Sequence, residues 1–429
     1  MYLIKGCQAQ IYTYSMSLTR REWLAGTAQL AAAAALQPAE DSLPDRRAFA
    51  IPPDQTYLNS AFIHPIPIAA AQAVHRYIET REFSRERWSG DDLAAKVRAQ
   101  FAALIGAEPA EISLVESTSR GENLVVNGLG IPSALARRSA AGAKAAGNVV
   151  TDALHFEGSL ILYGELKKRG LDVRLVKPRD WRIDVADIEK AVDRQTKLVA
   201  VSLVSWYNGF QHDLTRICDL AHAHGARVYA DIVQAAGNTP IDVHASGVDF
   251  CACSSFKWLM GDFGLGFLYV RQPLLDVVIR RSEYGYQQAD TVMHYLPSDP
   301  PADTPVTWTM HQDARAHFQV GTYGQGALNA LSVSLAYLQR VGVERIQAHR
   351  QPLLRRLREE LPRLGFTSIT PPGTSSAIVA FTAPDAEKRF GARLQQARVS
   401  VTLSGDRVRI SPSLFNDMRD VDRLLGALS

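Results

Sequence analysis

The chain has 429 residues, of which 46% are hydrophobic and 21% charged, so it is long enough for a sizeable core and two domains. A formal net charge of +3, with Lys and Arg scattered along the chain, argues against a nucleic-acid partner. Four cysteines on this length do not make a disulfide framework, and no Cys or His cluster accompanies Cys251 and Cys253, so we expect no metal site.

Residues 1–45 are predicted to be a leader. The twin-arginine pair Arg20-Arg21 precedes an Ala/Leu-rich run over residues 24–36, which is shorter than the ~20 residues that a membrane span needs. This order is typical of a Tat export signal, and Met16 would serve as its start. We therefore expect the Tat translocon as a partner and a periplasmic location, or a cytoplasmic one if the leader is not used. An amphipathic N-terminal helix is the alternative interpretation.

The next part of the chain predicts an N-terminal segment over residues 46–70, which packs with a small domain, and a large domain over residues 71–334. From about residue 112, β-rich runs alternate with helical stretches, which is typical of an α/β fold with a mostly parallel sheet. The predicted strands are Glu111–Val115, Asn148–Asp152, Asp172–Val176, Lys197–Val204, Arg227–Asp231, Phe250–Ser254 and Leu265–Val270. The predicted helices are Ala69–Thr80, Leu93–Leu104, Glu122–Leu129, Gly158–Arg169, Asp184–Val192 and Leu214–His224.

A turn-rich loop over residues 297–305 follows, and then a long helix over Gly326–Val341. Residues 335–429 alternate helices with strands, including Ala377–Phe381 and Arg407–Ser411, and predict a small C-terminal α+β domain.

Two charged residues fall at predicted strand ends, where open α/β sheets carry their sites. Asp231 ends one strand and precedes Gln234, and Lys257 follows another strand 26 residues later. On its own, an Asp at a strand end is typical of a loop cap, and a Lys at such a position is typical of a solvated surface charge. Together they suit pyridoxal 5′-phosphate (PLP), which needs a Schiff-base lysine and an acid beside its pyridine nitrogen.

A phosphate cradle is predicted over residues 116–122, between a strand and a helix. Free N–H groups and the helix dipole at such a junction favour phosphate. The alternative is a capped helix and nothing more, since Ser119 and Glu122 have capping-box spacing. Thr322, after Gly321, is a candidate second phosphate contact.

Two longer segments carry a family resemblance. Residues 228–237, with their D-x-x-Q pattern, and residues 247–270 around Lys257 resemble the class V aminotransferase (cysteine desulfurase-like) PLP enzymes. Order and spacing match from about Tyr57 to the C-terminus. The resemblance implies PLP as the cofactor and the PLP-dependent transferase fold type I.

The resemblance also implies a role for each matching residue. Lys257 corresponds to the Schiff-base lysine, Asp231 to the partner of the pyridine nitrogen, and Gln234 to a donor to the ring oxygen. His155 corresponds to the residue stacked on the ring, and Asn208 lies at the cofactor edge. The phosphate contacts are Thr118, Ser119, Ser254 and Thr322.

The remaining correspondences concern the substrate and the assembly. Arg409 matches an arginine that grips the substrate carboxylate, and Asn59 is a second candidate for substrate binding. The alternative interpretation is that Arg409 is an ordinary arginine on a solvent-facing strand. Because family dimers supply the contact at Thr322 from the neighbouring subunit, we expect a homodimer with a shared active site.

Several positions depart from the cysteine desulfurases. No cysteine follows Cys253, Thr402 stands where they have a second arginine, and Phe256 stands where they have histidine. The aromatic residues beside Lys257 resemble kynureninases, whereas residues 205–210 and 409–412 resemble isopenicillin N epimerase-like members.

We therefore expect an enzyme that transforms a small-molecule amino acid substrate at Cα, as an epimerase, a transaminase or a lyase. A kynureninase-like hydrolase is the alternative enzyme, and an exported PLP-fold binding protein without turnover is the alternative of another class.

Overall fold

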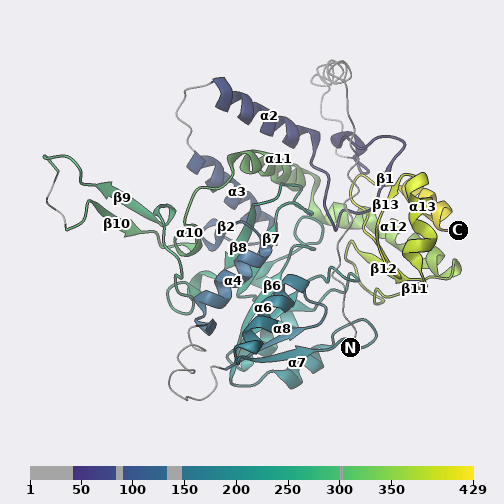
Figure 1. The fold of residues 1–429 in the computed structure, drawn as a ribbon, viewed down its shortest axis with the longest axis horizontal. Coiled ribbons are helices and arrows are strands. Elements are labelled where there is room, and N and C mark those ends of the chain that lie inside the picture. The colour runs from purple at the N-terminus through teal and green to yellow at the C-terminus, as the bar shows by residue number, and fades with distance from the viewer. Residues whose placement is uncertain (1–41, 84–89, 133–146, 300, 302) are drawn as a thin grey trace. The chain divides into compact units, whose positions relative to one another are not determined.

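The computed structural model describes residues 42–83, 90–132, 147–299, 301 and 303–429, and the residues from Leu43 to Ser429 form one unit (Figure 1). The predicted leader lies almost wholly outside the described residues. In the described part of the chain, no helix is both long and apolar enough to cross a membrane.

A seven-stranded sheet forms the centre of the large domain (Figure 1). Its strands lie in the order β2-β8-β7-β6-β5-β3-β4; β8 is antiparallel to both of its neighbours and all other pairs are parallel. The bounds are β2 Ile112–Val115, β3 Asn148–Asp152, β4 Asp172–Val176, β5 Thr196–Ser202, β6 Arg227–Asp231, β7 Phe250–Ser254 and β8 Gly266–Val270. Four of the seven begin and end where predicted, and the expected mostly parallel α/β class is confirmed.

Alternating side chains of the central strands supply two cores, because successive residues of a strand point to opposite faces. Val199 of β5 and Val228 of β6 belong to one cluster, whereas Leu198 and Tyr229 belong to the other. The covering helices are α2 Ile68–Phe83, α3 Gly90–Ile105, α4 Thr118–Gly128, α6 Glu157–Lys168, α7 Val185–Ala191, α8 Leu214–Ala223, α9 Val243–Ser246, α10 Ala314–Phe318 and α11 Gln325–Val341. Short 3-10 helices cover Arg46–Ala48, Pro109–Glu111, Gln272–Leu274 and Tyr286–Gln288.

The C-terminal region carries a four-stranded antiparallel sheet in the order β11-β12-β15-β14. The strands are β11 Thr367–Ser368, β12 Val379–Thr382, β14 Thr402–Ser404 and β15 Arg407–Ile410, and the helices are α12 Val343–Arg363, α13 Ala386–Gln396 and α14 Met418–Leu428. The domain boundary placed at residue 334 falls inside α11, which runs unbroken into this region.

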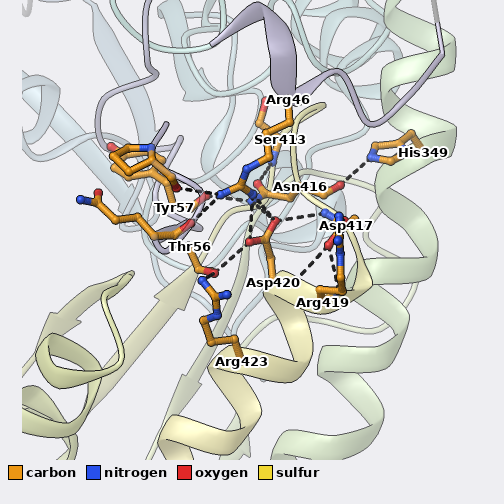
Figure 2. A network of polar contacts seen from close by, with 12 residues as sticks. Arg46, Thr56, Tyr57, His349, Ser413, Asn416, Asp417, Arg419, Asp420 and Arg423 are labelled. Carbon is orange, nitrogen blue, oxygen red and sulfur yellow. Dashed lines mark hydrogen bonds and ion pairs between the residues drawn. The ribbon is translucent and has the colours of Figure 1, made fainter. Parts of the chain in front are cut away.

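The N-terminal segment is tied to this C-terminal region. β1 (Thr56–Tyr57) pairs in parallel with β13 (Val399–Ser400). Asp420, at the start of α14, accepts hydrogen bonds from Thr56 Oγ1 at 2.9 Å and Asn416 Nδ2 at 2.9 Å and forms an ion pair with Arg46 at 3.3 Å (Figure 2). The segment that leads to Asn59 is therefore held against the C-terminal region, and Asn59 itself forms an isolated bridge with Ser411.

An antiparallel hairpin, β9 (Ala289–Met293) and β10 (Val306–Met310), was not predicted (Figure 1). Only the loop between its strands, residues 297–305, was expected. Its strands bury no side chain fully, so they lack the buried alternation by which strands are detected. Val292, Met293 and Trp308 are all more than half exposed.

Candidate active site

Four neighbouring parallel strands each end on a buried polar residue. β3 ends on Asp152, β5 on Ser202, β6 on Asp231 and β7 on Ser254. Because parallel strands share a carboxyl edge, these side chains gather along one line, with Ser202 paired to Asp231 in the sheet register. The candidate site is built along this edge.

Lys257 lies three residues beyond β7. Its Nζ is 5.9 Å from the centre of the Phe156 ring and 5.8 Å from that of Phe256. Burial and the charge of Arg409 lower the pKa of Lys257 to about 8, although Asp231 opposes them. A substantial fraction of the amine is therefore neutral near pH 8, as a nucleophile or proton acceptor must be.

Asp231 is 2% exposed, and its Oδ1 accepts a hydrogen bond of 2.8 Å from the amide of Val233. Burial raises the pKa of Asp231 to about 6, while His155, this hydrogen bond and Lys257 act in the opposite direction. Asp231 and Lys257 each influence the other's pKa, so the structure brings together the two charged residues expected to hold the cofactor.

The predicted phosphate residues Thr118 and Ser254 contact each other directly. The Oγ atoms lie 2.9 Å apart, Thr118 N donates to Ser254 Oγ at 2.9 Å, and Ser254 N donates to Thr118 Oγ1 at 2.9 Å. Gly121 allows this approach, because a Cβ there would lie 2.8 Å from Cβ of Ala252 in β7. Ser119 lies in the first turn of α4, whose N-cap is Ser117 rather than Ser119.

His155 follows β3 and is 1% exposed. Its Nδ1 lies 2.8 Å from Ser202 Oγ, and its Nε2 lies 3.2 Å from Oε1 of the buried Glu122. The charge of Asp231 also contributes to the raised pKa of His155, which places this ring in the same group of residues.

Gln234 is held by two partners. Its Oε1 accepts a hydrogen bond of 2.9 Å from the indole of Trp258, and its Nε2 donates one of 3.0 Å to the carbonyl of Ala61. The orientation of the amide is thereby fixed, and Nε2 keeps one hydrogen for another acceptor.

Arg409 enters the site from β15. Its guanidinium donates to Trp206 O at 2.8 Å and to Thr402 Oγ1 at 3.0 Å, and Thr402 donates in turn to Asn59 Oδ1 at 2.7 Å. Burial and the neighbouring Arg407 lower the pKa of Arg409 to about 9. The two predicted substrate residues, Arg409 and Asn59, are thus joined through Thr402.

Two predicted cofactor residues are engaged elsewhere. Asn208 donates to Trp181 O at 2.7 Å and Ile369 O at 3.0 Å, and its Oδ1 accepts from Phe210 N at 3.0 Å. Thr322 is exposed and forms a short hydrogen bond with Tyr286. Their contacts with PLP stay predictions.

Four further residues of the site have no individual role predicted from the sequence: Glu122, Ser202, Phe156 and Trp258. Glu122 is the last residue of the predicted cradle and has capping-box spacing with Ser119, and Trp258 is an aromatic neighbour of Lys257. No local pattern identifies them, because each acquires its role through a partner in another element.

The residues present fit PLP. The site offers an amine with a lowered pKa, a buried acid near it, a buried imidazole beside that acid, and hydroxyl and N–H donors at a helix N-terminus. No group of three potential metal ligands occurs among the described residues.

Comparison with known proteins agrees with this fit. A family model for class V aminotransferases matches residues 68–424. A probable cysteine desulfurase of Methanothermobacter thermautotrophicus is 28% identical over 313 residues, which is 69% of this chain and 70% of that protein. A cysteine desulfurase of Klebsiella pneumoniae is 28% identical over 312 residues, which is 72% of this chain and 70% of that protein.

Solved structures share the fold. An apo cysteine desulfurase from Thermococcus onnurineus aligns with a TM-score of 0.76 at 23% identity, over 90% of this chain and 97% of that one. A cystine C-S lyase in complex with cysteine persulfide aligns with a TM-score of 0.74 at 20% identity, over 88% of this chain and 97% of that one. The chain therefore belongs to the class V aminotransferase family and is a PLP-dependent enzyme of fold type I.

Proposed function

We propose that the enzyme acts at Cα of an α-amino acid, with epimerisation or transamination as the outcome. The observation that carries this proposal is the environment of Arg409. Its guanidinium is 3% exposed, no described carboxylate lies within ion-pair distance, and its Nε has no partner among the described residues. A buried cation without a counter-charge is costly unless a ligand supplies one, and an α-carboxylate does.

The residues of the site then have separate roles in the proposed reaction. PLP, when bound, supplies the electron sink for charge that develops at Cα. Lys257 moves the proton at Cα, which its lowered pKa suits. Arg409 orients the substrate through its carboxylate, and Asp231 stabilises a protonated ring nitrogen.

The cysteines do not favour the desulfurase reaction of the relatives. Cys218, Cys251 and Cys253 are buried, and burial raises the pKa of each thiol, to about 12 for Cys218. The thiolate is the nucleophile in persulfide formation, so these residues are unsuited to it. Cys7, the fourth cysteine of the sequence, lies outside the described residues.

The proposal is tested by hydrogen exchange at Cα. The purified enzyme with PLP is incubated with L- and D-amino acids in D₂O, and proton NMR follows loss of the Cα–H signal. Chiral chromatography then separates epimerisation from formation of a keto acid. We expect exchange with at least one amino acid and none with Lys257→Ala. Absence of exchange across the panel, or sulfide release from cysteine as the sole activity, contradicts the proposal.

A kynureninase-like hydrolysis is the second candidate. The rings of Phe156 and Phe256, whose centres lie 5.9 and 5.8 Å from Nζ of Lys257, favour it, since they offer flat apolar contacts to an aromatic substrate side chain. Formation of anthranilate from kynurenine would support this reaction, and its absence would exclude it.

We further propose a homodimer in which Thr322 completes the partner's site. The exposed apolar residues of the β9–β10 hairpin and the exposed position of Thr322 support this proposal. Lys257→Ala and Thr322→Ala chains, refolded together, form mixed dimers. If Thr322 acts in the partner, one site of each mixed dimer is intact and activity returns; without a shared site, mixing restores nothing.

Export remains a proposal carried by the twin-arginine sequence at Arg20-Arg21. Replacing both residues by lysine is expected to keep the protein in the cytoplasm of a Tat-competent host, as fractionation would show. Equal periplasmic amounts of both proteins would contradict it.

A further inference from the structure

Glu122 is a buried acid that lies behind the candidate site. It belongs to α4, is 1% exposed, and has no Lys or Arg within ion-pair distance among the described residues. Three donors converge on its carboxylate: Tyr163 Oη at 2.8 Å, His155 Nε2 at 3.2 Å, and Ser159 Oγ through a short hydrogen bond. His155 is the one member of this set that can carry a positive charge.

The geometry fixes one proton of His155 and leaves room for a second. A carboxylate only accepts hydrogen bonds, so Nε2, which faces Glu122, carries a hydrogen. Nδ1 faces the hydroxyl of Ser202 at 2.8 Å, and a hydroxyl can donate to a bare nitrogen or accept from a protonated one. The ring can therefore become an imidazolium without losing a partner.

The charges around His155 favour that cation. Glu122 of α4 faces it directly, and Asp152 of β3 and Asp231 of β6 lie farther away. Two tyrosine rings, Tyr163 of α6 and Tyr229 of β6, complete its surroundings at 6.5 and 6.4 Å between ring centres. Burial alone lowers the pKa of His155, but the charge and hydrogen bond of Glu122, aided by the two aspartates, raise it above its ordinary value.

We propose that Glu122 is a positioning residue that holds His155 as an imidazolium, with Nε2–H directed at Glu122, against the face of the PLP ring. A cation at that face would favour negative charge on the bound ring. His155 would then contribute charge, rather than exchange a proton with substrate, because both of its nitrogens are engaged inside the protein. The inference rests on PLP lying against His155 and not on which reaction follows.

The protonation state of His155 can be measured directly by NMR. ¹⁵N-histidine NMR is recorded from pH 5 to 9 on the full chain with PLP bound and on the cofactor-free protein, and His155→Gln identifies the signals. In the wild type we expect both ring nitrogens to be protonated at pH 7, so that the titration midpoint lies above that pH. Glu122→Gln keeps the shape but removes the charge, and is expected to lower the midpoint by at least one pH unit, a tenfold loss of proton affinity.

The matched control is Glu157→Gln. Glu157 lies two residues after His155 but is exposed, so its substitution is expected to leave the midpoint unchanged. Should Glu122→Gln fail to fold, Tyr163→Phe provides the second variant: it removes a donor to Glu122 but keeps its charge, so His155 is expected to stay protonated at pH 7.

Two results overturn the inference: a neutral His155 at pH 7 in the wild type, or the same midpoint in Glu122→Gln as in the wild type. The histidine NMR signals distinguish failure of this inference from failure of the proposed stacking or of the proposed reaction. If His155 titrates as proposed but its signals do not move on addition of PLP, the stacked arrangement is wrong and with it the assigned effect on the ring. If no hydrogen exchange at Cα is observed but His155 titrates as expected, only the proposed reaction is contradicted.

Discussion

The indole Nε1 of Trp258 donates a hydrogen bond of 2.9 Å to Oε1 of Gln234. Since the Oε1 of Gln234 accepts this hydrogen bond, its Nε2 is turned toward the carbonyl of Ala61 and keeps a second hydrogen for another acceptor. The aromatic residue after the lysine thus holds Gln234, the predicted donor to the cofactor's ring oxygen, whereas the rings of Phe156 and Phe256 lie near Nζ of Lys257.

Replacing Trp258 by Phe should weaken PLP binding. The variant removes the hydrogen bond that orients Gln234, and a single hydrogen bond is worth about 1 kcal/mol, so the PLP dissociation constant is expected to rise roughly fivefold. Absorbance titration of the cofactor-free protein measures it. Trp181→Phe, at a residue that is 42% exposed, is the control. An unchanged dissociation constant in Trp258→Phe would show that Gln234 is oriented by other contacts.

The attachment of PLP to Lys257 should depend on pH with a midpoint near 8. Attack by the amine requires its neutral form, and the pKa of Lys257 is lowered to about 8 by burial and by Arg409. Stopped-flow absorbance gives the rate of attachment from pH 6 to 10. Arg409→Gln should move the midpoint upward, whereas the exposed Arg363→Gln should not. A midpoint near 10 in the wild type would refute the assigned environment of Lys257.

Asp231→Asn should stabilise the cofactor-free protein while it impairs PLP chemistry. The folded-state pKa of about 6 lies above the ordinary 3.8, so this group's contribution to stability is complete below pH 3.8 and is lost as the pH rises through 6. At pH 8 the buried carboxylate costs about 3 kcal/mol, which the amide avoids. Urea unfolding at pH 5 and pH 8 should show a larger gain at pH 8. Asp422→Asn, at an exposed position, should show none; a loss of stability in Asp231→Asn at pH 8 would contradict the prediction.

Thr402→Val should weaken substrate binding with little effect on turnover. Valine keeps the shape of threonine but loses the hydrogen bonds to Arg409 and Asn59. We expect KM to rise roughly fivefold, for a loss of about 1 kcal/mol, with kcat within about twofold of the wild type. The exposed Ser400→Ala is the control. A fall in kcat at constant KM would mean that Thr402 acts in the chemical step.

The central sheet and the residues at its edge follow from local sequence patterns. Strands such as β3 and β6 are detected from their own residues, because buried β-branched runs are local. Their order along the chain then delivers Asp231 and Lys257 to one edge, since parallel strands end on the same side. The exposed hairpin strands β9 and β10 lack such a local signal and were missed.

The surroundings of those residues depend on tertiary packing instead. Glu122 and His155 are 33 residues apart, and Thr402 and Asn59 are 343 apart, so no periodicity relates them. The position of Glu122 depends on the close packing of α4 against β7, where Gly121 meets Ala252. Hydrogen bonds act over about 3 Å, and only packing fixes positions to that precision; the charge of His155 and the orientation of Gln234 and Arg409 therefore belong to the folded chain.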